Sequence, residues 1–179
     1  MEEALTRCAR GDLSAFGDIV REHQAMVFSI ASHSLRDTSR AEEIAQEVFL
    51  RLHQNLQKIQ SAAHLMLWLR QVTTRRCIDE VRRNPAQPPL SLEEAPEPLA
   101  TPPAGDPLLS ERLRRLVAAL PEKARMMIIL RYQEELDLAE IAEVLEIPIN
   151  TVKSRLQRAL AVLREKLESS LGKVSHETS

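Results

Sequence analysis

The sequence predicts an all-α fold of two small helical domains joined by a proline-rich acidic linker. Its 179 residues include 26 Leu and 20 Ala, but only 4 Gly and 3% aromatic residues. Leu and Ala favour helices, whereas strands and hairpins use β-branched, aromatic and glycine residues. Eight of the ten prolines lie between Pro85 and Pro107 and divide the helical sequence in two. This composition excludes an all-β fold, and the scattered glycines exclude a dinucleotide-binding loop.

Charge and cysteine content narrow the function classes. The net charge of -2 provides no overall positive field for nucleic acid, so any such site must come from local patterning. Cys8 and Cys77 are far apart in the sequence, form no C-x-x-C pair and fit a reducing compartment. The sequence has neither a basic-then-apolar leader nor an apolar run that could span a bilayer. We expect a cytoplasmic protein without a metal, a cofactor or a small-molecule substrate.

The linker comprises residues 84–110. It contains no Lys or Arg and four acids, Glu93, Glu94, Glu97 and Asp106. Proline lacks an amide donor and disrupts helices, and this segment has little apolar surface to bury. We interpret it as an extended tether between domains at 1–83 and 111–179. The alternative is a long surface loop within one domain, but structureless loops of this length are uncommon in compact domains.

Four helices are expected in the N-terminal domain. Gly11-Asp12 ends a short first helix, and Asp12 can cap a second helix that runs to about Leu35. The capping-box spacing of Ser39 and Glu42 predicts the start of the third helix, which ends near Lys58. A loop at 60–64 then leads to a fourth helix at 65–83. The apolar stripe of the third helix comprises Ile44, Ala45, Val48, Leu52, Leu56 and Ile59.

The C-terminal domain has the pattern of a helix-turn-helix. Pro121 suits a first helical position, and Asp137 and Glu140 have capping-box spacing. Pro148 breaks the chain, after which Asn150 can cap the last helix. Two turns of helix, a short break and a longer basic helix are typical of this motif. We expect helices at 111–119, 122–132, 138–145 and 151–169.

The last helix is the first candidate nucleic-acid site. On a helical wheel, Val152, Leu156, Ala159 and Leu163 face inward. The other side offers basic groups for phosphates and base edges, and hydroxyl and amide groups for hydrogen bonds. The alternative is an ordinary solvated amphipathic helix, which the preceding capped helix and the Pro148 break make less favoured. The candidate residues are Thr151, Lys153, Ser154, Arg155, Gln157 and Arg158.

Taken in order, these motifs resemble bacterial RNA polymerase sigma factors of the extracytoplasmic-function (ECF) group. The first half of the resemblance consists of Arg10-Gly11-Asp12 with Ala15-Phe16, the segment 41–50, and Trp68-Leu69 with Asp79 and Arg82-Arg83. The second half consists of Leu120-Pro121 with Arg125, Leu130-Arg131-Tyr132, Glu140-Ile141-Ala142, and 151–156 with Arg158-Ala159.

The resemblance implies two partners for the N-terminal domain. The helix at 41–58 would bind the β′ clamp helices of core RNA polymerase through Glu43, Gln46, Glu47 and Leu50. The loop at 60–64 and the helix after it would bind the separated strands of the minus-ten promoter element. The cations available for this are Lys58, His64, Arg75, Arg76, Arg82 and Arg83. Intrahelical pairs of Arg75 with Asp79 and Arg76 with Glu80 are the structural alternative, because both have i,i+4 spacing.

The resemblance assigns the C-terminal domain to duplex DNA. Its last helix would read the minus-thirty-five element in the major groove, and the domain would also meet the β flap of polymerase. An anti-sigma factor is a further implied partner. The turn at 146–150 departs from the family pattern because it has no glycine to accept a left-handed conformation.

Two other function classes compete with this interpretation. A stand-alone helix-turn-helix regulator would account for residues 120–170 but not for the N-terminal domain, and it would usually dimerise on palindromic DNA. A helical adaptor without a nucleic-acid role would tolerate loss of Arg155 and Arg158. An enzyme is the least favoured class, because the five His residues have no metal-ligand spacing and no nucleophile–base pair is apparent.

Overall fold

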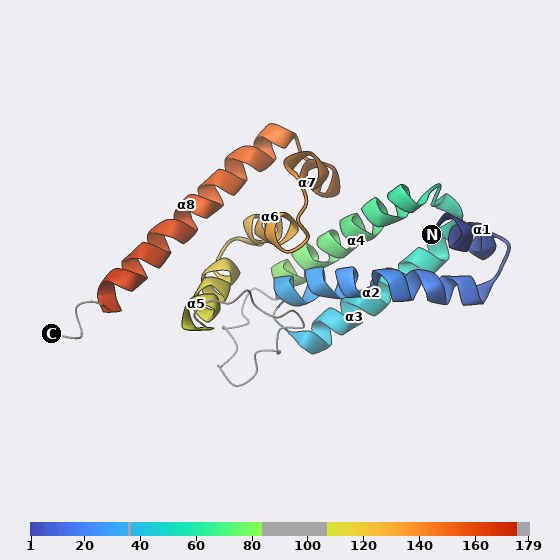
Figure 1. The fold of residues 1–179 in the computed structure, drawn as a ribbon, viewed down its shortest axis with the longest axis horizontal. Helices are drawn as coiled ribbons and strands as arrows, with labels where there is room; N and C mark the ends of the chain where they lie inside the picture. The colour runs from blue at the N-terminus through green and yellow to red at the C-terminus, as the bar shows by residue number, and fades with distance from the viewer. Residues whose placement is uncertain (36, 84–106, 175–179) are drawn as a thin grey trace.

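The computed structural model describes residues 1–35, 37–83 and 107–174, and every regular element within them is a helix (Figure 1). This confirms the all-α expectation. Most of the expected linker lies outside the described residues, and its last residues, from Pro107, belong to a helix. The elements are α1 (Glu2–Ala9), α2 (Leu13–Leu35), α3 (Thr38–Asn55), the short 3-10 helix η1 (Leu56–Lys58), α4 (Ala62–Arg83), α5 (Pro107–Ala118), α6 (Glu122–Tyr132), α7 (Leu138–Leu145) and α8 (Ile149–Val174).

The junction between α1 and α2 forms as expected. Gly11 adopts a left-handed φ of 90°. Asp12 accepts a hydrogen bond from the backbone N–H of Ser14 at 2.9 Å and pairs with Arg7 at 2.7 Å. The Ser14 hydroxyl also donates to this carboxylate, and it has the largest effect on the pKa of Asp12. Together with the Arg7 guanidinium, it lowers that pKa to about 2. The carboxylate therefore stays charged and holds the start of α2.

The start of α3 differs from the expectation. Asp37, not Ser39, is the N-cap, and its carboxylate accepts the backbone N–H of Arg40 at 3.0 Å. Either residue could cap from the sequence alone, because a cap needs only a short polar side chain just before the helix. The prediction of Ser39 as the cap is therefore wrong by two positions.

Helix α4 begins at Ala62, three residues earlier than expected, so the loop before it is shorter. The Ser61 hydroxyl accepts the backbone N–H of His64 at 3.1 Å. The Glu2 carboxylate accepts the backbone N–H of Ala62 at 2.7 Å. Two free amides at the helix start are thereby satisfied, one of them by a side chain 60 residues away in sequence.

The C-terminal half contains the expected helix-turn-helix. Asp137 and Glu140 form a complete capping box at the start of α7. Helix α8 starts at Ile149, because the Pro148 carbonyl accepts the backbone N–H of both Thr151 and Val152. Asn150 thus lies inside the first turn, and its prediction as a cap is wrong.

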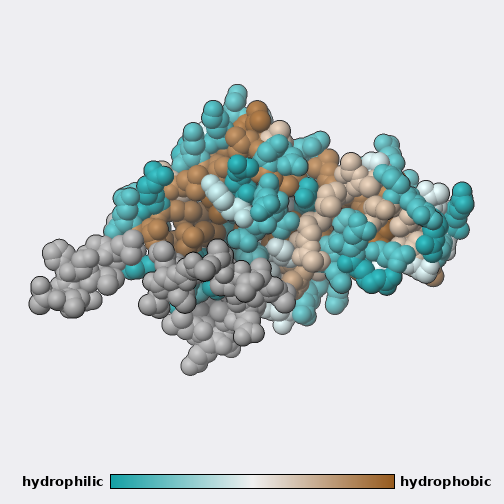
Figure 2. All heavy atoms as spheres, viewed as in Figure 1, coloured by the Kyte–Doolittle hydropathy of each residue, from teal (hydrophilic) through white to brown (hydrophobic). Residues whose placement is uncertain are grey.

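The apolar stripe of α8 faces inward as predicted. Val152, Leu156, Ala159 and Leu163 are all at most 7% exposed. They pack in a helix that contacts α5, α6 and α7. Figure 2 shows hydrophilic residues along the outer edge of α8 and hydrophobic residues on the side toward α5 and α6. No helix in the described ranges is both long and apolar enough to cross a lipid bilayer.

The two halves pack against each other. Helix α6 contacts α2 and α4, and α7 contacts α4 (Figure 1). One continuous cluster of buried apolar residues includes Ile44 and Leu69 from the first half and Met126 and Ile141 from the second. The interpretation of residues 84–110 as a tether between separate domains did not predict this contact. The contact forms because both halves contribute apolar surface and matching polar groups to it.

Candidate nucleic-acid and protein interfaces

The outward face of α8 carries uncompensated positive charge. Lys153, Arg155, Gln157 and Arg158 are exposed. Thr151 and Ser154 are half-buried, and the Ser154 hydroxyl donates to the Thr151 carbonyl at 3.2 Å. Among the described residues, none of these three cations has an ion-pair partner. Their guanidinium and ammonium groups are free to meet phosphates or base edges.

The turn before α8 uses a strained residue in place of glycine. Glu146 ends α7 in the left-handed region, with φ 53° and ψ 46°. A side chain in this conformation costs about 1 kcal/mol relative to the right-handed region. The turn sets the angle at which α8 leaves α7.

The cations of α4 are used differently. Arg75 and Arg82 are seven residues apart, so they lie on the same face of the helix. Arg75 pairs with Glu146, and the Arg82 Nε donates to a Glu122 carboxylate oxygen at 3.0 Å. Both carboxylates belong to the C-terminal half. Arg75 thus pairs with an acid of the other half and not with Asp79, the partner that the structural alternative named.

A second set of charges fastens α4 to α3. Arg76, only 13% exposed, pairs with Glu47, so a predicted DNA contact is engaged by a predicted polymerase contact. Glu80 is buried and pairs with Arg40 at 2.7 Å, and Arg40 also reaches Glu43. These two carboxylates raise the pKa of Arg40, so the arginine is permanently charged. Arg76 and Glu80, whose i,i+4 spacing made an intrahelical pair the structural alternative, each pair with a residue of α3.

The other expected minus-ten residues lie in η1 and near the two ends of α4. Lys58 is exposed and donates to the Asn55 side chain at 2.9 Å. His64 is half-buried, and its Nδ1 accepts the backbone N–H of Gln60 at 3.2 Å. Arg83 is exposed at the end of α4. At 1.5 Å per residue, His64 and Arg83 are about 28 Å apart, so these groups form a track along the helix rather than a pocket.

An open apolar groove of about 820 Å³ runs between α2 and α3. Two of the predicted polymerase contacts, Gln46 and Leu50, line it, and Leu50 is 60% exposed. The sequence reasoning missed the α2 side of this groove. Its signal was a spacing of four residues, which places a row of side chains on one helix face. The residues concerned are Phe16, Val20, Gln24 and Phe28.

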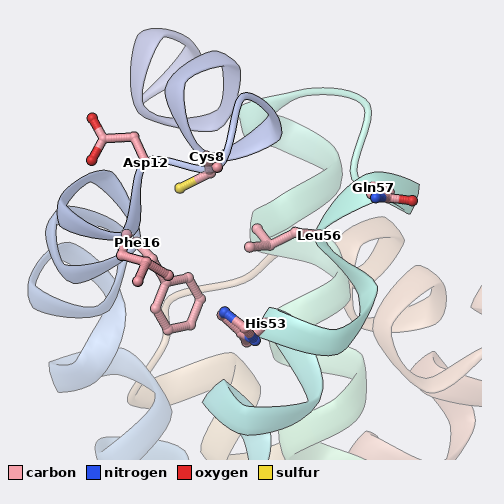
Figure 3. A pocket seen from close by; sticks show the side chains of 8 residues that line it. Cys8, Asp12, Phe16, His53, Leu56 and Gln57 are labelled. Carbon is pink, nitrogen blue, oxygen red and sulfur yellow. The ribbon is translucent and has the colours of Figure 1, made fainter.

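A smaller cavity of about 220 Å³ lies between α1, α2 and the end of α3 (Figure 3). The rings of Phe16 and His53 meet edge to face in it, with centroids 5.1 Å apart.

Burial raises the pKa of the Cys8 thiol, and it raises that of Cys77 to about 12. Both thiols are protonated at neutral pH and are poor nucleophiles. The described residues contain no group of three side chains that could hold a metal ion.

Family models match both halves of the chain. Residues 19–86 match sigma-70 region 2, and residues 110–163 match sigma-70 region 4. The ECF RNA polymerase sigma factor SigW of Bacillus subtilis (strain 168) is 29% identical, over 93% of this chain and 96% of SigW. The ECF RNA polymerase sigma factor SigK of Mycobacterium tuberculosis (strain H37Rv) is 30% identical, over 95% of each chain.

Solved structures share the fold. CnrH, in a complex with the cytosolic domain of CnrY, has a TM-score of 0.68 at 20% identity, covering 94% of this chain and 97% of CnrH. The sigma factor RpoE of Bartonella quintana, in a complex with the anti-sigma factor NepR, has a TM-score of 0.63 at 18% identity, covering 87% and 98%. With both sigma-70 regions in order and relatives matched along nearly their whole length, the chain belongs to the ECF group of RNA polymerase sigma factors, a family of non-enzymatic transcription initiation factors.

Proposed function

We propose that this ECF sigma factor divides its work between three surfaces: the α2–α3 groove binds core RNA polymerase, α4 binds the minus-ten element, and α8 reads the minus-thirty-five element. The observation that carries the proposal is the outward face of α8, where Lys153, Arg155 and Arg158 are exposed and unpaired among the described residues. A helix-turn-helix places such a face in the major groove. The stand-alone regulator is not favoured, because both sigma-70 regions are present.

The α2–α3 groove suits a helical protein partner. It is open and lined mainly by aromatic and aliphatic side chains, with Glu42 and Gln46 among its polar lining residues. Leu50 presents an aliphatic side chain that water covers in the isolated chain. An amphipathic helix burying its apolar face there gains the usual hydrophobic stabilisation. We assign this partner to the β′ clamp helices, with Glu43 and Glu47 at the edge of the contact.

The minus-ten site follows α4. Lys58 and Arg83 are exposed cations without ion pairs among the described residues, and His64 lies near the start of the helix. A track of this length matches a strand of several nucleotides, whose phosphates the cations would neutralise. Arg75 and Arg82 join the track on the face that now carries their pairs with Glu146 and Glu122.

The remaining partners follow from the family. We assign 1–83 to the polymerase and minus-ten contacts, 84–110 to the connection, and 111–179 to the minus-thirty-five element and the β flap. RpoE of Bartonella quintana is solved with an anti-sigma factor, and we propose that this chain also has one. The site of action is then the cytoplasm, where polymerase and promoter DNA are found.

Co-elution with core polymerase on size exclusion tests the central assignment. The variant Gln46→Ala/Leu50→Ser removes two side chains that line the groove, and Gln54→Ala, exposed on the same helix and outside the groove lining, is the control. We expect co-elution of the wild type and the control and its loss in the double variant. A folded wild-type chain that never co-elutes would overturn the polymerase assignment and return the weight to a stand-alone regulator.

A further inference from the structure

The first turn of α8 contains an exposed side-chain amide, that of Asn150. This amide forms no hydrogen bond within the part of the chain that the structure describes. The Pro148 carbonyl accepts the backbone N–H groups of Thr151 and Val152 at 2.9 and 3.1 Å, so the backbone supplies the acceptor for the first turn. Asn150 therefore keeps an acceptor oxygen and two donor hydrogens for a ligand.

Short polar side chains at two other helix starts are used differently. Asp37 caps α3 by accepting one backbone N–H at 3.0 Å, and Asp137 caps α7 by accepting two, at 2.8 Å each. Their oxygens are engaged by the ends of their own helices. Asn150 lies inside its helix, one residue after the start at Ile149. Its amide has no such structural use, and another explanation for a free amide at this place is required.

Asn150 belongs to the outward face of α8. Ala159, nine residues later and thus half a rotation away around the helix, is only 5% exposed. Gln157, seven residues later, shares the face of Asn150 and is exposed as well. Figure 2 shows hydrophilic residues along this outer edge of α8. The asparagine is therefore in line with the residues that we assign to the minus-thirty-five element.

The place of Asn150 along the helix favours base edges over phosphates. In a helix-turn-helix, the N-terminal residues of the second helix contact the base edges in the major groove. Asn150 is the second residue of α8, and its short side chain loses less conformational freedom on binding than a long arginine does. A neutral amide also gains less from a phosphate than the neighbouring Lys153 does.

The chemistry of the amide identifies the base. In the major groove adenine presents an acceptor, N7, beside a donor, the N6 amino group. The amide NH₂ and oxygen of asparagine match these two groups at once, whereas guanine presents two acceptors. We propose that Asn150 is a specificity-determining residue that reads one adenine of the minus-thirty-five element through this pair of hydrogen bonds. The proposal rests on the assignment of α8 to that element made above.

The proposal also limits where a second amide can read. Asn150 and Gln157 are separated by about 10.5 Å along the helix axis, and neighbouring base pairs by about 3.4 Å. A base pair contacted by Gln157 therefore lies at most about three steps from the adenine. Removal of either amide should change the base preference at its own position and leave that of the other intact.

Selection from a random-sequence duplex library tests the proposal, with the full chain reconstituted with core polymerase. The variants are Asn150→Ala, which removes the amide, and Asn150→Asp, which keeps the shape but replaces the donor group with an acceptor. The control, Gln133→Ala, removes an exposed amide at the end of α6. Competition anisotropy then compares the selected duplex with duplexes that carry each of the other three base pairs at the position concerned.

We expect the wild type and the control to prefer adenine at one position of the upstream element by about tenfold. Asn150→Ala should lose this preference and bind the selected duplex about tenfold more weakly, with preferences elsewhere changed less than about twofold. Asn150→Asp should favour cytosine there, because a carboxylate accepts from the cytosine N4 amino group.

A purely structural role for Asn150 predicts a different result. Aspartate is favoured near helix starts by the helix dipole, so Asn150→Asp would then keep the wild-type preference for adenine. That outcome would overturn the proposal. So would an Asn150→Ala variant that weakens binding equally at every position or changes nothing.

Arg155→Ala/Arg158→Ala separates this failure from failure of the minus-thirty-five assignment. If the wild type selects no upstream element, or if the double arginine variant selects the same element as strongly, α8 does not read it and the proposed function fails as well. If the arginines are required and loss of the Asn150 amide changes no base preference, only the role of Asn150 is wrong.

Discussion

Helices α4 and α8 are similar in length and in basic character, but their cations have different surroundings. Both are long, both are rich in arginine, and each buries an apolar face. On α8, Arg155 and Arg158 are solvent-exposed cations without ion pairs among the described residues. On α4, Arg75, Arg76 and Arg82 each have a carboxylate partner that comes from another helix.

The difference shows that the position of acidic residues on neighbouring helices decides whether the cations of a basic helix face form ion pairs. Helix α8 is an outer helix, and within the described part of the chain its neighbours form no ion pair with Lys153, Arg155 or Arg158, whereas α4 lies between α3 and the α6–α7 pair. We therefore expect an arginine on α8 to be available for a ligand, whereas an arginine on α4 contributes to the packing of helices through its ion pair.

The largest expected effect is on α8. Arg155→Ala/Arg158→Ala should weaken binding to a promoter duplex selected with the holoenzyme by about 100-fold, since each lost base contact costs about 1–3 kcal/mol. The thermal midpoint should stay within about a degree or two of the wild type, because neither side chain has an ion pair in the part of the chain that the structure describes. Anisotropy and thermal melts measure both. Arg164→Ala, on a different face of α8, is the control, and an equal loss in that variant would contradict the assigned face.

Arg40→Ala should lower the stability of the fold, in contrast to the variants of α8. It removes the guanidinium that pairs with the Glu80 carboxylate, whose side chain is 9% exposed. Breaking such a pair costs several kcal/mol when fully buried, and the partial exposure of Arg40 reduces this to about 2 kcal/mol. Urea denaturation should show that loss, while Arg51→Ala, exposed on the same helix, should not. Equal stability of the two variants would mean that this pair does not fasten α3 to α4.

Glu134 tests the contact between the halves through pH. Burial raises the pKa of this carboxyl, so the folded chain favours its neutral form and loses stability as pH rises from about 4.5 through the folded pKa. Glu134→Gln keeps an acceptor for Ser29 but cannot ionise. Its thermal midpoint should match the wild type below pH 4.5 and exceed it at neutral pH. If the thermal midpoints of the two proteins differ by the same amount at every pH, ionisation of Glu134 does not affect the stability of the fold.

The smallest effect belongs to the turn of the helix-turn-helix. Glu146→Gly should raise the free energy of unfolding by less than about 1 kcal/mol, because glycine takes the left-handed conformation without strain. Glu146→Ala keeps the β-carbon and loses the pair with Arg75, so it isolates the side-chain contribution. If the two variants are equally stable, backbone strain at this turn is absent.

Local patterns in the sequence predicted local structure well. The capping box of Asp137 and Glu140 and the inward stripe of α8 both form, because each depends only on residues three to eleven positions apart. The partners of Arg75 and Arg76 could not be found this way. Glu146 is 71 residues away from Arg75, and Glu47 is 29 residues away from Arg76, so a helical wheel sees only the i,i+4 neighbours.

The exposure of the candidate site residues could therefore be predicted only in part, and their roles stay predictions. Predicting the outward residues of α8 required only the period of one helix. Gln46 and Leu50 line the groove on the expected helix. The α2 side of that groove required knowing which helix lies beside α3. Ser39 lies within α3 and Asn150 within α8, although each was predicted to be a cap. Several polar residues near a helix start can serve as its cap, and the sequence alone does not show which one does.

The bond from Glu2 to the start of α4 has a practical consequence for anyone producing this protein. The Glu2 carboxylate supplies the acceptor for the Ala62 amide, so the first turn of the chain helps to shape the segment that leads into the proposed strand-binding track. An affinity tag fused ahead of Met1 would add bulk and charge at that junction. Purification through the other end of the chain, followed by tag removal, leaves the junction native for reconstitution with polymerase.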